Sequence, residues 1–190
     1  FKLAFASILV PASKLKRSPC LGYSKNKRVS DEAPYQLFLE KVDSMLSDLQ
    51  WVKQHIREPG QVSIREEDAR NAKYDRIDMV ITSPPYVNGM DYIINYKIEM
   101  AWLELVKSYD ELSRLKEQMV VCDNVSKRVM KDYSSTKSKF SDTWLDEICQ
   151  RIEKRLSEKE GYRRTDMHLI VRKYFDDLYP VLTNVYDGLK

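Results

Sequence analysis

The chain has 190 residues, of which 43% are hydrophobic and 32% charged, and its formal net charge of +3 neither requires nor excludes a nucleic-acid partner. Its apolar runs are shorter than the roughly 20 residues of a membrane-spanning helix, so we expect no membrane partner. Three scattered cysteines indicate neither a disulfide framework nor a metal site, and we expect a reducing, cytoplasmic setting. The apolar residues 1–10 lack a cleavage signal and are interpreted as a buried helix or strand.

Residues 13–30 form a basic segment. It contains six basic residues and no acidic one, and its proline, glycine and serines disfavour a helix. We predict a loop, with two interpretations left open: a solvated connector, or an arm that contacts DNA phosphates. The candidate phosphate contacts are Lys14, Arg17, Lys25, Lys27 and Arg28.

A helix and two short strands are predicted next. Apolar residues recur at three- and four-residue steps from position 38 to 56, which predicts an amphipathic helix opened by Pro34. Alternation at 61–65 predicts one strand, and the apolar run at 77–82 predicts a second. Because two short strands are not stable alone, we expect them to belong to a larger parallel sheet covered by helices.

The remainder is predicted to be largely helical. Helical spacing recurs at residues 93–106, around 112–119, at 143–156 and from 166 onward. The basic, serine-rich stretch 127–139 interrupts this pattern and is predicted to be irregular.

The segment Ser83-Pro84-Pro85-Tyr86 is the most specific feature of the sequence. Its two prolines stiffen the backbone and leave carbonyl groups free of sheet hydrogen bonds, and an aromatic ring follows directly. Such a turn suits the exocyclic amine of a flipped base. The Ser83 hydroxyl and the Pro84 carbonyl would accept the amine hydrogens, and Tyr86 would stack on the base, worth ~1–3 kcal/mol. The alternative is a proline-terminated edge strand with a packed tyrosine.

Residues 62–102 resemble the catalytic region of the bacterial DNA amino-methyltransferases, which carry a (Ser/Asn/Asp)-Pro-Pro-(Tyr/Phe) motif after a strand and methylate cytosine N4 or adenine N6. The resemblance implies S-adenosylmethionine as cofactor, double-stranded DNA as partner, and a role in restriction–modification. It implies that residues 83–86 are catalytic and that Asp68 lies near the cofactor adenine. Serine at the first motif position favours cytosine N4, with adenine N6 as the next alternative.

The resemblance also implies an α/β fold: part of a Rossmann-like methyltransferase, helix-rich, with two short parallel strands and a helical insertion. Residues 1–108 would belong to the catalytic core, 109–164 would form the insertion, and 165–190 would form a return helix of the core. The insertion is a candidate target-recognition region. Its candidate DNA contacts are Lys127, Arg128 and Lys131, and a helix surface of mixed charge is the alternative.

One motif of the resembled family is missing. No Phe-x-Gly-x-Gly loop, which holds the methionine end of the cofactor in those enzymes, occurs in the 190 residues. We therefore expect the rest of the polypeptide to lie before Phe1 and after Lys190, and this chain alone to be inactive. The alternative from a different class is a non-catalytic DNA-binding or regulatory module that retains the methyltransferase fold.

Overall fold

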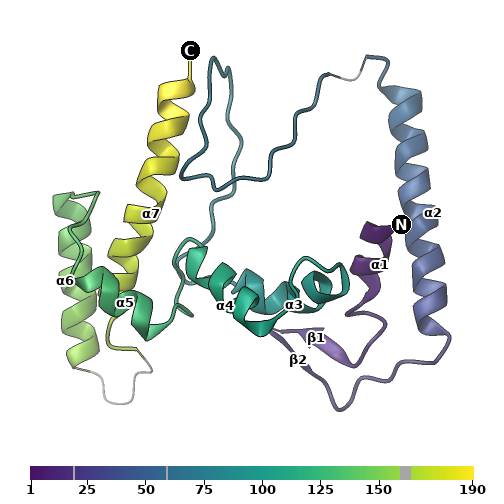
Figure 1. The fold of residues 1–190 in the computed structure, drawn as a ribbon, viewed down its shortest axis with the longest axis horizontal. Helices are drawn as coiled ribbons and strands as arrows, with labels where there is room; N and C mark the ends of the chain where they lie inside the picture. The colour runs from purple at the N-terminus through teal and green to yellow at the C-terminus, as the bar shows by residue number, and fades with distance from the viewer. Residues whose placement is uncertain (19, 59, 159–163) are drawn as a thin grey trace. The chain divides into compact units, whose positions relative to one another are not determined.

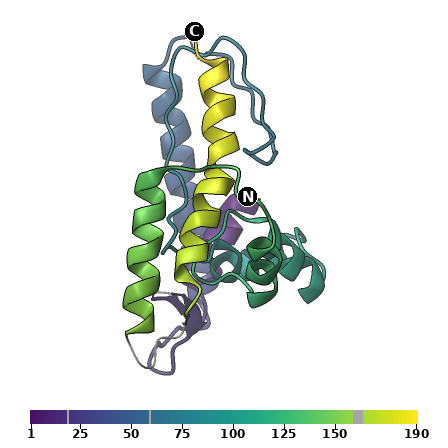
Figure 2. The same cartoon turned by 90° about the vertical axis from the view of Figure 1, so that its left-hand side faces the viewer.

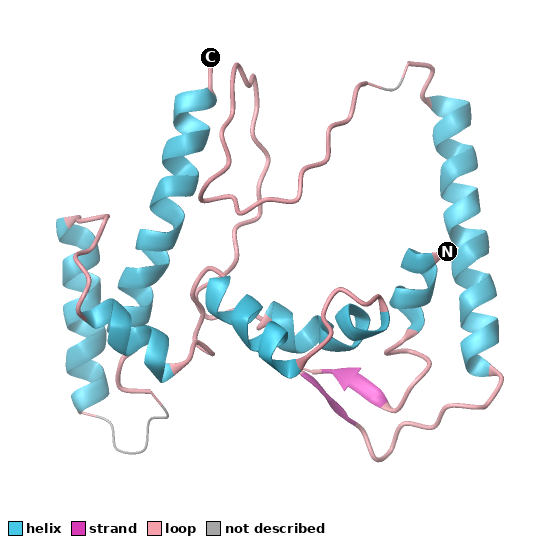
Figure 3. Cartoon of the chain, viewed as in Figure 1, coloured by secondary structure: helices cyan, strands magenta, loops and turns pink. Residues whose placement is uncertain are grey.

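A computed structural model of the chain describes residues 1–18, 20–58, 60–158 and 164–190. Within these residues it contains seven helices and one two-stranded antiparallel sheet (Figures 1 and 3). The chain divides into two compact units. Unit 1 comprises Phe1–Ile64 and Met90–Leu115, and unit 2 comprises Arg65–Gly89 and Lys116–Lys190. None of the helices in the described residues is both long and apolar enough to span a bilayer.

Unit 1 is built around the short first helix. Its elements are α1 (Lys2–Ile8), β1 (Leu15–Arg17), β2 (Leu21–Tyr23), α2 (Ala33–His55), α3 (Tyr92–Trp102) and most of α4 (Tyr109–Gln118). Ala4 and Ala6 are buried, and such small side chains let α1 pack closely against α2 and α3. The Phe5 ring lies edge-on to Trp102 with 5.7 Å between centroids.

The basic segment 13–30 is not a simple loop. β1 and β2 lie within it and pair antiparallel, with Leu15 opposite Tyr23 and Arg17 opposite Leu21. The helix predicted from position 34 is confirmed as α2, which has a proline in its first turn, where the missing amide hydrogen has no helical partner. No residue of α2 is buried, because α1 covers only part of its apolar surface.

Unit 2 consists of three helices and a long irregular segment. The helices are α5 (Lys127–Ser134), α6 (Thr143–Ser157) and α7 (Met167–Gly188), and α6 lies alongside α7 (Figures 1 and 2). Val121, Met130 and Ile170 form the unit 2 core. The prediction of an irregular stretch at 127–139 is wrong for its first half. Ser126 starts α5 there by accepting a hydrogen bond from the Val129 amide at 3.3 Å.

The predicted Rossmann-like α/β fold is wrong. Residues 61–65 and 77–82 form no strand, and the described residues contain no parallel sheet. Ile77 makes only an isolated parallel bridge to Leu189. A strand needs a hydrogen-bonded neighbour along its length. Residues 61–65 have no paired strand within the described chain and residues 77–82 pair only at Ile77, so Ile64 and Ile81 remain 91% and 90% exposed.

Gly188 is expected to tolerate no side chain. It is buried where the end of α7 meets residue 74, and a Cβ atom there would lie 2.6 Å from the Cβ of Tyr74. Gly188→Ala should therefore lower the free energy of unfolding by about 1–3 kcal/mol, measured by urea titration. Gly60→Ala is the matched control, because a Cβ at position 60 meets nothing within 4 Å. Equal stability of the two variants would contradict the prediction.

Candidate base-binding turn

The Ser83-Pro84-Pro85-Tyr86 segment lies in unit 2 without regular secondary structure, and the residues after it attach it to the unit 2 core. Val87 packs against that core, and its carbonyl accepts a hydrogen bond from the Asp123 amide at 3.0 Å. Gly89 then approaches the turn closely. A Cβ atom at position 89 would lie 2.8 Å from the Tyr86 carbonyl oxygen, so only glycine fits without displacement.

Tyr174 of α7 anchors the turn itself. Its hydroxyl donates a hydrogen bond to the Pro85 carbonyl at 2.7 Å. Burial, with nearby Tyr86 as a smaller cause, raises the pKa of the Tyr174 hydroxyl, so this group remains a protonated donor at neutral pH. The carbonyl of the second proline is therefore fixed by α7.

The other groups of the turn are accessible. Ser83 and Pro84 are exposed, and Tyr86 is 69% exposed. Within the described part of the chain, neither the Ser83 hydroxyl nor the Pro84 carbonyl takes part in a hydrogen bond. The turn thus presents one aromatic face and two acceptor groups on a backbone that is held at Pro85 and Val87.

Asp68, the predicted cofactor contact, is bound by Arg70. The Arg70 Nε atom lies 2.9 Å and 3.0 Å from the two carboxylate oxygens, and Arg70 also lies 3.7 Å from Asp177. The hydrogen bond from Arg70 lowers the pKa of Asp68 below the ordinary 3.8. Any stability from this pair is present above that value and is lost as the pH falls through the lowered pKa. Asp68 therefore acts first as a partner of Arg70.

The basic residues of segment 13–30 fall into two groups. Arg17 and Lys27 are engaged within unit 1. Arg17 pairs with Glu99 and donates to the Asn95 carbonyl at 3.0 Å, and the Lys27 ammonium donates to backbone carbonyls at 2.7 Å and 2.9 Å. The other four basic residues of the segment are exposed and accessible to a partner: Lys14, Lys16, Lys25 and Arg28.

The basic residues of α5 divide in the same way. Lys127 and Lys131 are exposed, whereas Arg128 pairs with Glu117. A groove of about 290 Å³ lies beside α5. Its charged lining residues are Asp132, Lys137, Lys139, Lys173, Asp176 and Asp177. Because lysines and aspartates are equal in number there, the groove has no net positive charge. The basic residues of α5 without an acidic partner in the described structure are Lys127 and Lys131, which lie outside the groove lining.

Asp176 organises unit 2 and was not identified from the sequence. One carboxylate oxygen accepts from the Ser138 hydroxyl at 2.8 Å and from the backbone amides of Lys139 and Phe140 at 3.0 Å and 2.8 Å. The other accepts from the Tyr133 hydroxyl at 2.6 Å. Both oxygens of the buried Asp176 carboxylate thereby accept hydrogen bonds.

Asp177, the next residue, ties α7 to a second segment. It accepts from the Val121 amide at 3.0 Å and from the Lys173 ammonium at 2.8 Å. The sequence does contain a signal for both aspartates, because two adjacent acids interrupt the apolar stripe of the predicted last helix. Acids at core-facing helix positions indicate buried carboxylates with specific donors.

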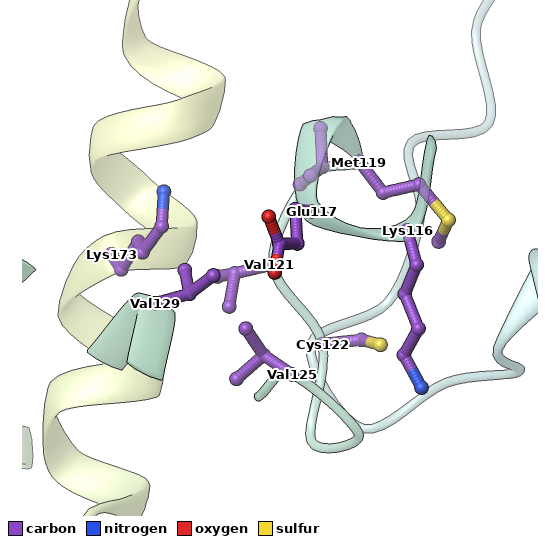
Figure 4. A pocket seen from close by; sticks show the side chains of 9 residues that line it. Lys116, Glu117, Met119, Val121, Cys122, Val125, Val129 and Lys173 are labelled. Carbon is purple, nitrogen blue, oxygen red and sulfur yellow. The ribbon is translucent and has the colours of Figure 1, made fainter. Parts of the chain in front are cut away.

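A small cavity lies next to the unit 2 core (Figure 4). The side chains around it come from residues 116–129 and from Lys173 of α7. Its volume is about 10 Å³, enough for about one water molecule. It is therefore a packing defect of the core and is far too small for a nucleobase or for an adenosyl group.

The accessible turn, the exposed lysines and the paired aspartates are the features of this chain that bear on function. The turn combines an aromatic face with hydrogen-bond acceptors, whereas Asp176 and Asp177 support the fold. Comparison of the chain with protein-family models, with curated proteins and with solved structures gave no match.

Proposed function

We propose that the chain takes part in the S-adenosylmethionine-dependent methylation of an exocyclic amine in double-stranded DNA, with cytosine N4 as the first candidate and adenine N6 as the second. One observation carries the proposal. The 83–86 turn is held at Pro85 by Tyr174, while Ser83, Pro84 and Tyr86 stay accessible with their acceptor groups unused by the described residues. The resemblance of this motif to that of the DNA amino-methyltransferases supports the same reading.

The turn would act by holding a flipped base. The base would stack on Tyr86 and donate its amine hydrogens to the Ser83 hydroxyl and the Pro84 carbonyl. An exocyclic amine is a poor nucleophile because its lone pair is delocalised into the ring. Accepting both hydrogens localises that lone pair on nitrogen, and the contacts strengthen as the nitrogen becomes tetrahedral, which is the condition for catalysis.

The described residues do not by themselves fit the cofactor. The chain lacks a paired-glycine loop, and the Asp68 carboxylate is already bound by Arg70. In the proposal, further residues of the same polypeptide, before Phe1 and after Lys190, supply the cofactor site, and the exposed Lys14, Lys25, Arg28, Lys127 and Lys131 contact DNA phosphates.

The proposal predicts that the chain prefers unpaired bases that carry an amine. Fluorescence anisotropy should compare duplexes with one unpaired cytosine, adenine or thymine. Thymine has a carbonyl where cytosine has its amine. The Ser83 hydroxyl can rotate to donate to that carbonyl, but the Pro84 carbonyl can only accept and would face another acceptor without a donor. We expect the cytosine duplex to bind at least about 10-fold more tightly than the thymine duplex.

The control is internal to the turn. Ser83→Ala should weaken binding of the cytosine duplex but keep the preference over thymine, because the Pro84 carbonyl, which can only accept, is retained. Tyr86→Ala should weaken binding to all three duplexes, because every base has a face that can stack. Equal affinity for cytosine and thymine in the unaltered chain would contradict the proposed role of the turn.

The alternative is a non-catalytic DNA-binding module. The sequence predicted that such a DNA-binding or regulatory module would retain the methyltransferase fold, and the described residues, whose only sheet has two short antiparallel strands, do not have that fold. The missing glycine loop is what favours a non-catalytic module. Both readings predict that calorimetric titration of S-adenosylmethionine into the 190-residue chain shows no micromolar binding. Such binding would overturn the view that the cofactor loop is missing, and methylated product from the full-length polypeptide would exclude the alternative.

A further inference from the structure

Unit 1 leaves a continuous apolar stripe of α2 uncovered. Its members recur at alternating steps of four and three residues, which is the heptad spacing of a coiled coil. We call it the α2 stripe, and it consists of Tyr35, Leu39, Val42, Leu46, Leu49 and Lys53. Leu46 and Leu49, in its middle, are 51% and 66% exposed. The stripe has the spacing of a helix–helix interface but no partner helix among the described residues of unit 1.

The cover that α1 provides lies beside the stripe. The Phe1 ring contacts Phe38 with 6.4 Å between centroids, and Phe38 and Met45 are half-buried. Neither of these residues belongs to the α2 stripe. α1 therefore stabilises α2 along one side. Of the apolar members of the stripe only Val42 is half-buried, and Tyr35, Leu39, Leu46 and Leu49 remain exposed.

The charges of α2 indicate which partner fits the stripe. Asp31 and Glu32, which flank the start of α2, are acidic, whereas the last turn of α2 carries Lys53 and Arg57 lies just beyond its end. A helix with opposite charges at its two ends is complementary to an antiparallel copy of itself. A parallel copy would place like charges together at both ends.

We propose that the α2 stripe binds a second copy of this chain, with the two α2 helices antiparallel. This inference does not depend on the proposed function. Full overlap of Ala33–His55 with its copy places Leu39 opposite Leu49 and Val42 opposite Leu46. The shared length is about 34 Å at 1.5 Å per residue. Four apolar layers then fill the centre of the interface.

The antiparallel arrangement gives Lys53, the one charged residue of the stripe, a partner in the second copy. In the full-overlap register Lys53 lies opposite Tyr35 of the second copy, where its alkyl stem can pack and its ammonium can contact the aromatic ring. A lysine at a core-type position lowers stability but specifies register, because only registers that give it a partner are tolerated.

Sedimentation equilibrium of the full 190-residue chain tests the proposal. We expect a concentration-dependent dimer with about twice the 22.4 kDa mass of the chain. Leu46→Glu with Leu49→Glu should weaken the dimer at least about 100-fold, because four charges would enter its centre. Trp51→Glu is the matched control. Trp51 is also exposed on α2, at 57%, but lies outside the stripe, and its replacement should leave the dimer intact.

Three outcomes would overturn the proposal: a monomer at every concentration, a dimer unaffected by the double leucine change, or equal weakening by Trp51→Glu. Circular dichroism of each variant shows whether α2 remains helical.

Charge reversal tests the orientation of the two helices. Lys53→Glu with Arg57→Glu should weaken the antiparallel homodimer, and mixing it with the Asp31→Lys and Glu32→Lys variant should restore dimers. An unchanged homodimer after charge reversal would rule out the antiparallel arrangement.

Discussion

Replacing Asp176 with alanine is expected to remove most of the stability of unit 2. The change leaves the Tyr133 and Ser138 hydroxyls and the amides of Lys139 and Phe140 without their common acceptor. Unpaired buried donors cost free energy individually, and hydrogen bonds to a charged group are the stronger kind. We expect a loss of about 4 kcal/mol or more in the free energy of unfolding, measured by urea titration.

Two controls separate the hydrogen bonds from other effects of the change. Asp176→Asn can keep the oxygen that accepts from Ser138 and the two amides, so its loss should be clearly smaller than that of Asp176→Ala. Asp187→Ala removes an exposed aspartate from the end of the same helix and should change stability by less than about 0.5 kcal/mol. If Asp176→Ala unfolded at the same urea concentration as Asp187→Ala, the organising role of Asp176 would be refuted.

Under the proposed function, Tyr86→Ala in a polypeptide that also supplies the cofactor site is expected to lower the methyl-transfer rate by about 10- to 100-fold, because one base–aromatic stack is lost. The DNA affinity should fall less, because the contacts of the turn are strongest when the base reaches its reactive geometry. The assay is transfer of a tritiated methyl group to duplex DNA, followed by nucleoside analysis. N4-methylcytosine is the expected product, and N6-methyladenine is the near alternative.

Two further variants refine this test. Tyr174→Phe keeps the ring in the core but removes the hydrogen bond to Pro85, so it should lower the rate by less than Tyr86→Ala does. Cys20→Ser should leave the rate unchanged, because transfer to an exocyclic nitrogen requires no covalent adduct with a thiol. Full activity of Tyr86→Ala, or C5-methylcytosine as product, would refute the mechanism. Absence of any methylated nucleoside, with cytosine-selective binding retained, would favour the non-catalytic module.

The helices were largely predictable because helical periodicity is a local property. α2, α6 and α7 begin and end within a few residues of the expected positions, and the caps that start α5 and α6 lie immediately before them in the sequence. The strands were not predictable in this way. Apolar alternation at 61–65 gives only a tendency, and pairing depends on a neighbour that can be anywhere in the chain.

In the candidate site, too, local features were predictable from the sequence and contacts between distant residues were not. The structure describes unused acceptor groups at Ser83 and Pro84, whereas the stiffness that two prolines should give the 83–86 turn stays a prediction. The anchor at Tyr174 lies 89 positions away in the chain, and the donors of Asp176 lie 36 to 43 positions away. No local pattern pairs residues over such distances. The engagement of Arg17 and Lys27 within unit 1 was equally hidden, since a basic segment looks the same whether its charges are used internally or not.

α7 holds together segments that have little regular structure of their own. Tyr174 fixes the 83–86 turn, Asp176 fixes residues 138–140, Asp177 fixes residue 121, and Asn184 donates to the Arg70 carbonyl at 3.1 Å. Amide protons in these segments can exchange with solvent only when their tie to α7 opens. Native-state hydrogen exchange should therefore show residues 121, 139 and 140 sharing one opening free energy with the middle of α7, as a single cooperative unit.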